Sequence, residues 1–187
     1  DVSSRYIEEV PVKKAEALEF AILGTLQDGP AHGYELRKRL SQLLGMFQAL
    51  SFGSLYPTLK TLVSRGDITE QTDDTSSRRR IVYTITENGS KRFHDLLTNA
   101  GPDAWNDDTF GLHFAFFSRS SAKTRTSILE GRRMRLAERR AAMRESLERT
   151  RADAYTFELQ RHGLESVEHE MHWLDGLIEA EGKNQDN

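Results

Sequence analysis

Apolar residues recur with a helical period over the first part of the chain. From Lys14 to Gln27, and again from Gly33 to about Gly45, they are spaced three or four positions apart, which predicts two amphipathic helices. The turn-forming sequence Asp28-Gly29-Pro30 separates these helices. Residues 1–14 precede the first helix, and we expect them to form a solvated N-terminal arm.

A third helix is predicted to begin near Gly53 or Ser54 and to end at Gly66. Either Ser51 or Ser54 could cap it. Pro57 is tolerated only in the first turn of a helix, which supports this start. The apolar residues of the helix repeat at steps of four and three and should face the core: Leu55, Leu59, Leu62 and Val63.

After Gly66 the period changes to two, which is typical of strands. Residues 68–72 and 80–86 can pair as an antiparallel hairpin around a polar turn. Thr86 then begins another helix, which closes near Gly101-Pro102. Helices followed by a basic hairpin predict a winged helix-turn-helix with a two-stranded β wing over residues 15–100, so the fold class is mainly α.

The second half of the chain predicts helices only. An aromatic helix is expected from Trp105 to Phe117, a long helix from Ala122 to Arg161, and a last helix with a coiled-coil-like seam. A helix of about 40 residues spans roughly 60 Å, longer than one small domain needs. We therefore expect residues 104–180 to form an α-helical dimerisation domain, followed by a polar tail over residues 181–187.

Two apolar stripes are the predicted dimer contacts, and a two-fold of this kind would set the distance between recognition helices. Their residues are Leu129, Leu136, Met143, Leu147, Leu164, Val167, Met171, Leu174 and Ile178, with Ala154 and Phe157 continuing the first stripe.

Composition excludes several classes of protein. The 187 residues contain no cysteine, so disulfide frameworks and thiolate zinc sites are excluded and a cytosolic protein is expected. No apolar run approaches the roughly 18 residues of a membrane-spanning helix, so no membrane association is expected. The chain also lacks a Gly-rich phosphate loop, a nucleophile elbow and a paired-carboxylate pattern. We therefore expect no enzyme activity and no cofactor.

The net charge of −3 conceals a segregation of charge along the chain. Residues 32–92 carry ten basic against six acidic side chains, and residues 132–151 carry eight against three. From residue 152 onward there are nine acids and two bases. Phosphate binding depends on the local patch, so the winged-helix half remains suited to DNA.

The predicted DNA contacts lie on the third helix and the wing: Ser54, Tyr56, Pro57, Thr58, Lys60, Arg78, Arg79 and Arg80. The first turn of a helix presents unpaired amides and a positive dipole end to phosphates and base edges. The wing arginines suit a minor groove or the phosphate backbone. Two alternatives stay open: Tyr56 could seal the core, and the arginines could protect a hairpin edge by charge.

Three motifs together resemble the PadR family of bacterial transcriptional regulators. They are His32-Gly33-Tyr34-Glu35-Leu36, Gly53-Ser54-Leu55-Tyr56-Pro57-Thr58-Leu59, and a basic strand running into Tyr83-Thr84-Ile85-Thr86-Glu87-Asn88-Gly89. The helical second half is similar to the longer branch of the family, with Trp173 on its last helix. The sequence departs from the family pattern at Ser77, where a glycine usually precedes the wing basics.

The resemblance implies a dimeric winged-helix repressor that binds a pseudo-palindromic operator, released in many members by a small molecule. It places the family's recognition positions at Ser54, Tyr56 and Lys60, and its wing basics at Arg78, Arg79 and Arg80. Four aromatic residues are candidates for an effector pocket, with plain dimer core as the alternative: Trp105, Phe110, Phe114 and Trp173.

Two other classes of function compete with this interpretation. Glu165, His169 and His172 share one helix face and could bind a divalent ion in a metal-responsive protein. The coiled-coil half could also serve a protein-interaction adaptor in which the winged helix is only a scaffold.

Overall fold

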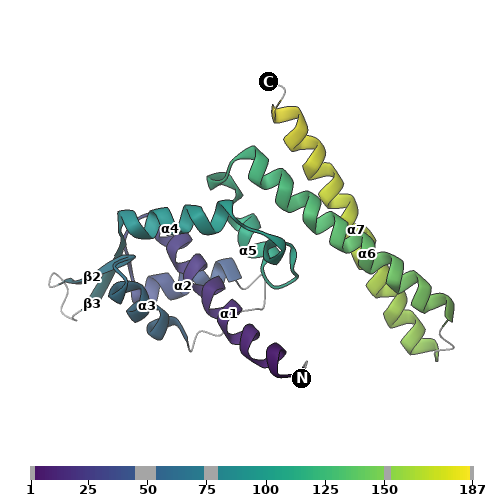
Figure 1. Cartoon of the computed structure of the whole chain (residues 1–187), viewed down its shortest axis with the longest axis horizontal. Coiled ribbons are helices and arrows are strands. Elements are labelled where there is room, and N and C mark those ends of the chain that lie inside the picture. Colours follow the sequence, from purple (N-terminus) through teal and green to yellow (C-terminus); the bar gives the residue numbers. More distant parts are fainter. Residues whose placement is uncertain (1–2, 45–53, 74–79, 150–152, 186–187) are drawn as a thin grey trace. The chain divides into compact units, whose positions relative to one another are not determined.

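The computed structural model describes residues 3–44, 54–73, 80–149 and 153–185, and the chain forms two compact units (Figure 1). One unit combines residues 1–99 with 107–120, and the other combines residues 100–106 with 121–187. The chain passes between the two units three times, after residues 99, 106 and 120, and the first of these changes lies next to the predicted boundary at Gly101-Pro102. None of the helices in the described ranges is long and apolar enough to cross a membrane.

The first unit is a winged helix, as predicted. Its elements are α1 (Ser3–Leu26), β1 (Ala31–His32), α2 (Gly33–Leu44), α3 (Leu55–Ser64), β2 (Ile68–Asp73), β3 (Arg80–Ile85), α4 (Glu87–Thr98), α5 (Phe110–Ala115) and η3 (Phe117–Arg119). Helix α1 begins at Ser3, so most of the expected N-terminal arm continues the first helix.

The sheet of the first unit has three strands in the order β1-β3-β2, all antiparallel. Ile68 pairs with Ile85 and Asp73 with Arg80, which confirms the predicted hairpin. Strand β1 was not predicted, because two residues are too short to show a period of two. It pairs Ala31 with Tyr83 and so ties the start of α2 to the wing.

Helix boundaries follow local backbone chemistry. Gly66 ends α3 with φ +76°, and Gly29 forms the turn after α1 with φ +124°, both in the region that favours glycine. Thr86 caps α4, because its Oγ1 accepts from the Gly89 amide at 3.1 Å. Ser54 occupies the corresponding position before α3 but makes no side-chain cap bond, so its predicted capping role is wrong.

The core of the first unit forms between α1 and the elements around it. Leucines 36 and 40 of α2 and leucines 55, 59 and 62 of α3 are buried there, as the spacing predicted. Phe116 packs edge-on against Phe20 and Phe93 at 5.3 Å from each ring. A Cβ on Gly24 would lie 2.3 Å from the Phe116 ring, so only glycine leaves room for it. This contact explains why residues 107–120 belong to the first unit.

The expected helix from Trp105 to Phe117 is wrong, because the segment breaks into η2 (Pro102–Trp105), α5 and η3. The polar run Asn106-Asp107-Asp108-Thr109 separates the pieces, since such side chains compete for local hydrogen bonds. Asn106, for example, donates to Asp103 Oδ1 at 3.3 Å.

The second unit is a helical hairpin of α6 (Ala122–Arg149) and α7 (Ala154–Gln185), whose ribbons lie side by side in Figure 1. The prediction of one helix from Ala122 to Arg161 is wrong, because α6 ends at Arg149 and Phe157 lies on α7. Basic residues of α6 pair with acidic residues of α7, including Arg125 with Glu181 at 2.7 Å and Arg144 with Glu168. The complementary charge of the two helices therefore acts within one chain.

Candidate nucleic-acid interface

Helix α3 exposes a short polar turn because its apolar residues all face the core. Leu55, Leu59 and Leu62 are buried, and Tyr56 is 55% exposed. The alternative that Tyr56 seals the core is thereby excluded. Pro57 lies in the first turn and is exposed together with Lys60, one turn further along. The first two turns of α3 thus present a phenol and an ammonium group to solvent.

Thr58 does not belong to this exposed turn, so its predicted exposure is wrong. It is only 8% exposed, and its hydroxyl donates to the Ser54 carbonyl oxygen at 2.8 Å. The reason is the helical period, because Thr58 stands next to Leu59 on the inward-facing side. The hydroxyl therefore serves the backbone of the helix start.

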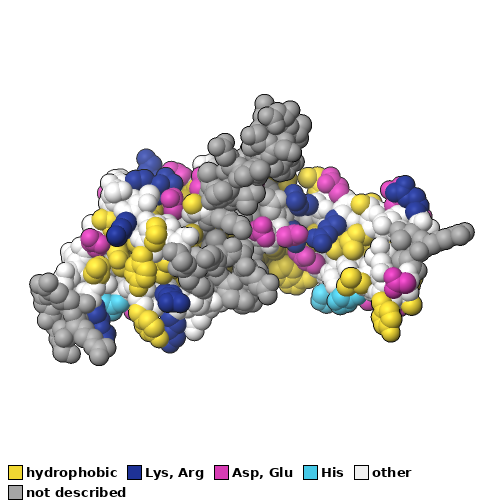
Figure 2. Space-filling model, turned by 90° about the horizontal axis from the view of Figure 1, so that it is seen from below, with side chains coloured by type: hydrophobic (Ala, Val, Ile, Leu, Met, Phe, Trp, Pro, Cys, Tyr) yellow, Lys and Arg dark blue, Asp and Glu magenta, His cyan; other side chains and the backbone are white. Residues whose placement is uncertain are grey.

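A surface hollow of about 640 Å³ adjoins the exposed turn of α3. It is lined by residues from β1, α2, α3 and β3: His32, Gly33, Tyr34, Glu35, Tyr56, Arg80, Ile81 and Tyr83. Tyr34 is 79% exposed at the start of α2. We name this surface the tyrosine hollow. Figure 2 shows basic and hydrophobic side chains side by side on the face beside the wing.

Tyr83 forms the buried wall of the tyrosine hollow. Burial raises the pKa of its phenol above the usual value, and the nearby Glu70 and Tyr56 add to the shift. The phenol therefore stays neutral at physiological pH. A Cβ on Gly33 would lie 3.5 Å from the Tyr56 ring and 3.6 Å from the Tyr83 ring, so glycine lets the backbone pass close to both.

An ion-pair network fixes the far end of α3 and the base of the wing. Arg65 follows α3 and pairs with Glu19 of α1 at 2.8 Å and with Asp67 at 3.1 Å. Arg92 of α4 also pairs with Glu19, at 2.9 Å. The hydrogen bond to Glu19 raises the pKa of Arg65. Because both carboxylates are buried, the network holds α3 and β2 in a fixed position on α1 and α4.

Part of the wing lies outside the described residues. Arg80 is exposed at the start of β3 and lines the tyrosine hollow, whereas Arg78 and Arg79 fall in the undescribed range 74–79, as does Ser77. Of the three predicted wing arginines, Arg80 is therefore the one that lies within the described residues.

The family model described as the transcriptional regulator PadR-like family matches residues 22–95, which include the exposed turn of α3 and the wing. A curated relative, the negative transcriptional regulator PadR of Bacillus subtilis (strain 168), is 27% identical over 173 residues. That match covers 86% of this chain and 95% of the relative. Residues 22–95 of this chain are therefore similar to the PadR-like family of transcriptional regulators.

Solved structures of the Bacillus subtilis PadR are also similar to this PadR-like chain. The complex with operator DNA matches with a TM-score of 0.44 and 24% identity, covering 88% of this chain and 98% of that one. The complex with p-coumaric acid matches with a TM-score of 0.42 and 23% identity, covering 89% and 99%.

The predicted dimer residues of this PadR-like chain are mostly buried inside its own hairpin. Leu129, Leu136, Val167, Met171 and Leu174 are each at most 5% exposed within the single chain. Met143, Leu147, Leu164 and Ile178 are half-buried. The heptad spacing correctly identified an apolar seam, but α6 and α7 supply the two sides of that seam from one chain.

The four aromatic residues predicted for an effector pocket have different surroundings. Phe110 and Phe114 contact each other in the first unit, with ring centroids 5.9 Å apart. Trp105 belongs to the second unit, where a Cβ on Gly131 would lie 2.1 Å from its ring. Trp173 is 42% exposed on α7. Phe114 lines a hollow on the first unit.

The metal alternative finds no support in the described residues, among which no group of three His, Cys, Asp or Glu side chains could hold an ion. Glu165 accepts a hydrogen bond from Arg161 at 3.2 Å, and His169 and His172 are exposed on α7.

Of the eight residues that line the tyrosine hollow, Tyr56 and Arg80 were predicted as DNA contacts and the other six were not. The spacing of Tyr34 from Leu36 and Leu40 places it off the apolar face of α2. Ile81 is 45% exposed on β3. The sequence did not predict this exposure, because the alternation of a strand does not show which of its two faces is buried.

Proposed function

We propose that this PadR-like protein is a dimeric repressor that binds a pseudo-palindromic operator through α3 and its Arg-containing wing. The observation that carries the proposal is the tyrosine hollow. Exposed Tyr34 and Tyr56 from two helices meet Arg80 from the wing at one surface. Aromatic phenols and guanidinium groups donate to phosphates and base edges, and a core would not expose them.

Each polar group of this surface has an assigned contact in the proposal. Helix α3 enters the major groove with its first turn leading. Tyr56 donates to a phosphate, and Lys60 reaches a phosphate or a guanine edge. Ser54 lies at the start of the same turn. Arg80, with Arg78 and Arg79, contacts the phosphate backbone or the adjacent minor groove.

The dimer interface that we propose uses apolar residues that the hairpin leaves exposed. Five of the eight large hydrophobic side chains exposed among the described residues lie on α6 and α7: Met134, Tyr155, Phe157, Leu159 and Trp173. Tyr155 is 88% exposed and Leu159 is 72% exposed. A second copy of the chain would cover such residues, and the two-fold would have to place the α3 helices about 34 Å apart.

Small-molecule release is the regulatory part of the proposal. The Bacillus subtilis relative has been crystallised with operator DNA and with p-coumaric acid. We propose that an effector of comparable chemistry releases this protein from its operator by binding the free and DNA-bound arrangements with different affinity.

Selection from random duplexes followed by DNase protection tests the DNA-binding proposal. The wild type should protect a pseudo-palindromic site, and Tyr56→Ala should weaken binding by roughly tenfold or more, because one contact of about 1 kcal/mol is lost in each half-site. Light scattering should show the same dimer for both proteins. Unchanged protection by Tyr56→Ala would refute the assigned site.

Salt dependence separates a repressor from a protein-interaction adaptor. Phosphate contacts release counterions, so the affinity for duplex DNA should fall steeply as salt rises. An affinity independent of salt would contradict phosphate binding by this surface.

A further inference from the structure

One polar face of α2 lies beside the tyrosine hollow and has no assigned role. Its residues have helical spacing and fall within an arc of about 100° around the helix axis: Tyr34, Arg37, Lys38 and Ser41. We name these four residues the α2 stripe. Leu36 and Leu40 are buried on the opposite side of the helix, so packing against the core fixes the direction in which the α2 stripe faces.

The α2 stripe carries positive charge although α2 also contains a carboxylate. Glu35 is the only acidic residue of α2, and it pairs with Arg39 on the flank of the helix. Arg37 and Lys38 are both exposed on the stripe, which has no acidic member. A solvated helix face usually alternates charges of both signs. The α2 stripe is therefore better suited to an anionic partner than to solvent alone.

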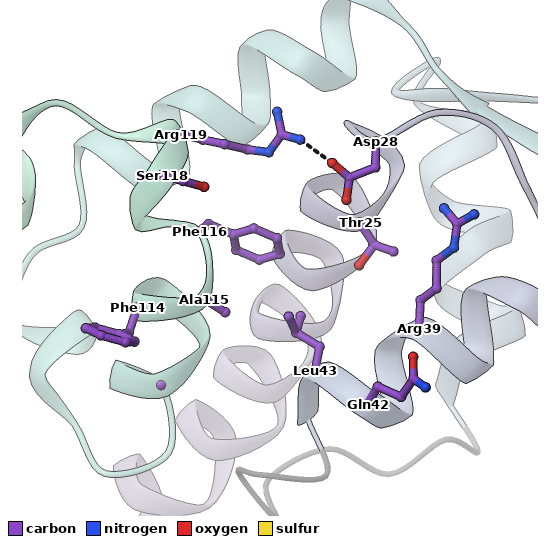
Figure 3. Close-up of a pocket in the computed structure, with 11 residues that line it drawn as sticks. Thr25, Asp28, Arg39, Gln42, Leu43, Phe114, Ala115, Phe116, Ser118 and Arg119 are labelled. Carbon is purple, nitrogen blue, oxygen red and sulfur yellow. Dashed lines mark hydrogen bonds and ion pairs between the residues drawn. The ribbon is translucent and has the colours of Figure 1, made fainter.

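The opposite flank of α2 borders a different surface (Figure 3). Arg39 and Gln42 line a hollow of about 540 Å³ whose walls also include Phe114 and Phe116. The three consecutive basic residues of α2 thus divide between two surfaces. Arg39 contributes to the hollow of Figure 3, whereas its two neighbours belong to the α2 stripe.

Tyr34 joins the α2 stripe to the surface that we assign to DNA. Its side chain is 79% exposed and lines the tyrosine hollow together with Tyr56 of α3 and Arg80 of the wing. Lys38 follows one helical turn later, roughly 6 Å further along the helix axis. The α2 stripe is therefore a continuation of the tyrosine hollow and not a separate surface.

Strand β1 fixes the α2 stripe relative to the wing. Ala31 pairs with Tyr83 and His32 pairs with Val82, so the chain enters α2 directly from the sheet that carries the wing. The α2 stripe cannot turn away from the wing without breaking this pairing. Groups that are held in place before binding lose little conformational entropy when a partner binds, which favours their use as contacts.

We propose that the α2 stripe binds the phosphate backbone of the operator, outside the groove that α3 enters. Tyr34 donates a hydrogen bond to one phosphate, and Lys38 pairs with another phosphate of the same strand. Successive phosphates of one strand are about 3.4 Å apart along the duplex axis, so two side chains one helical turn apart can each reach one. Arg37 adds positive charge beside them.

Phosphate contacts carry no base sequence. The α2 stripe therefore raises the affinity for every duplex and fixes the orientation of α3, while the choice of operator depends on other residues. This inference rests on the proposed repressor function and adds a third element, after α3 and the wing, to its DNA surface.

Lys38→Ala and Lys91→Ala form a matched pair of variants that tests the stripe. Both lysines are exposed in the winged-helix unit, and Lys91 lies on α4, outside the stripe and the tyrosine hollow. Lys38→Ala should lower the slope of log affinity against log salt concentration by about 2, because one phosphate contact is lost in each half-site. Lys91→Ala should keep the wild-type slope.

The same titration separates this inference from the proposed function. A wild type that binds no duplex, or binds it independently of salt, would refute the repressor function. A wild type with the expected salt dependence, together with an unchanged slope for Lys38→Ala, would overturn only the α2 stripe.

Tyr34→Phe tests whether the stripe contacts phosphates or bases, with Tyr155→Phe as the control. Each variant removes the hydroxyl of an exposed tyrosine, and Tyr155 lies on α7. Tyr34→Phe should weaken binding roughly tenfold or more, by the same factor for the selected operator and for an unrelated duplex of equal length. Tyr155→Phe should bind both duplexes like the wild type. Loss of affinity for the operator alone would overturn phosphate binding by Tyr34.

Ethylation interference locates the contact on the operator, because ethylation removes the charge of one phosphate at a time. Ethylation should weaken binding of the wild type at phosphates outside the groove that α3 enters. Lys38→Ala should become insensitive at one such phosphate in each half-site and keep the wild-type pattern elsewhere. A wild-type pattern at every phosphate would show that Lys38 does not make this contact.

Discussion

The winged-helix unit and the helical hairpin use the same residue types for different purposes. In the winged-helix unit, Glu19 and Asp67 are buried and pair with arginines from other elements, so their ion pairs fix the position of α3. Among the described residues of the hairpin, four ion pairs join α6 to α7, and some of these remain accessible, as the pair of Arg133 with Asp175 does. The exposure of apolar residues also differs between the units, because the hairpin has more exposed large apolar side chains than the winged-helix unit has.

The comparison teaches that an apolar stripe identifies a face and not its partner. The heptad spacing of Leu129 and Leu136 predicted a contact with another chain, and both are buried inside the hairpin. Tyr155 and Leu159 of α7 do not belong to the predicted stripes and are mostly exposed. The same two helices thus carry a largely buried apolar seam and several exposed apolar side chains.

Removing an aromatic ring should have the largest effect on stability, and the size of the loss should differ between the two units. Phe116→Ala should lower the free energy of unfolding by about 3–5 kcal/mol, because it empties a site enclosed by Phe20 and Phe93. Phe157→Ala removes an exposed ring and should cost less than about 1 kcal/mol in the same urea titration. Equal losses would contradict the difference in packing.

Variants of two neighbouring arginines of α6 allow a buried ion pair to be compared with an exposed one. Arg132 is 5% exposed and donates to Glu170 at 2.8 Å and to the Trp105 carbonyl at 2.9 Å. Arg132→Met should cost about 3 kcal/mol, because it leaves both acceptors without that donor. Arg133→Met breaks the accessible pair with Asp175 and should cost less than about 1 kcal/mol. Thermal unfolding of both variants measures the two losses of stability and therefore their ratio.

Lowering the pH should destabilise the winged-helix unit through His113. Burial lowers the pKa of this imidazole to about 4, below its ordinary value of 6.5, and its ring contacts Phe20 at 4.8 Å. Between these two values the unfolded state binds the extra proton, so stability is lost as the pH falls and regained as it rises. The loss should reach about 3 kcal/mol by pH 4.

The control for this effect is His113→Gln, whose side chain does not titrate. The difference in unfolding free energy between wild type and His113→Gln should change between pH 6.5 and pH 4, and should stay constant above pH 7. A constant difference over the whole range would show that His113 is not responsible.

The smallest effect concerns a single charge on α3. Lys60→Ala should lower the slope of log affinity for duplex DNA against log salt concentration by about 2, because one phosphate contact is lost in each half-site of the dimer. Lys91→Ala removes an exposed charge of α4, away from the tyrosine hollow, and should leave the slope unchanged. Filter binding at several salt concentrations measures both slopes.

Local signals predicted the winged helix and part of its candidate site. Leu55, Leu59 and Leu62 have a period that fixes which face of α3 is buried, and this leaves Tyr56 and Lys60 on the opposite face. Thr58 was misplaced because its hydroxyl is polar but sits beside the buried face, where the Ser54 carbonyl satisfies it. Residue type suggested exposure, and position on the helix decided burial.

Contacts between distant residues were beyond the sequence pattern. Strand β1 exists because Ala31 pairs with Tyr83, more than fifty residues later, and two residues carry no period of their own. The break between α6 and α7 likewise follows from packing, because basic residues of one helix meet acidic residues of the other only when the chain reverses.

By itself, the sequence determined which residues are apolar, where helices and the wing begin, and which motifs match the PadR-like family. These properties depend on neighbours within about one helical turn or one strand. The tertiary structure alone decided that Phe116 fills the space above Gly24 and that α6 and α7 bury their stripes in each other. Such outcomes depend on which distant surfaces meet, because burial free energy rewards any complementary partner and only the folded chain selects one.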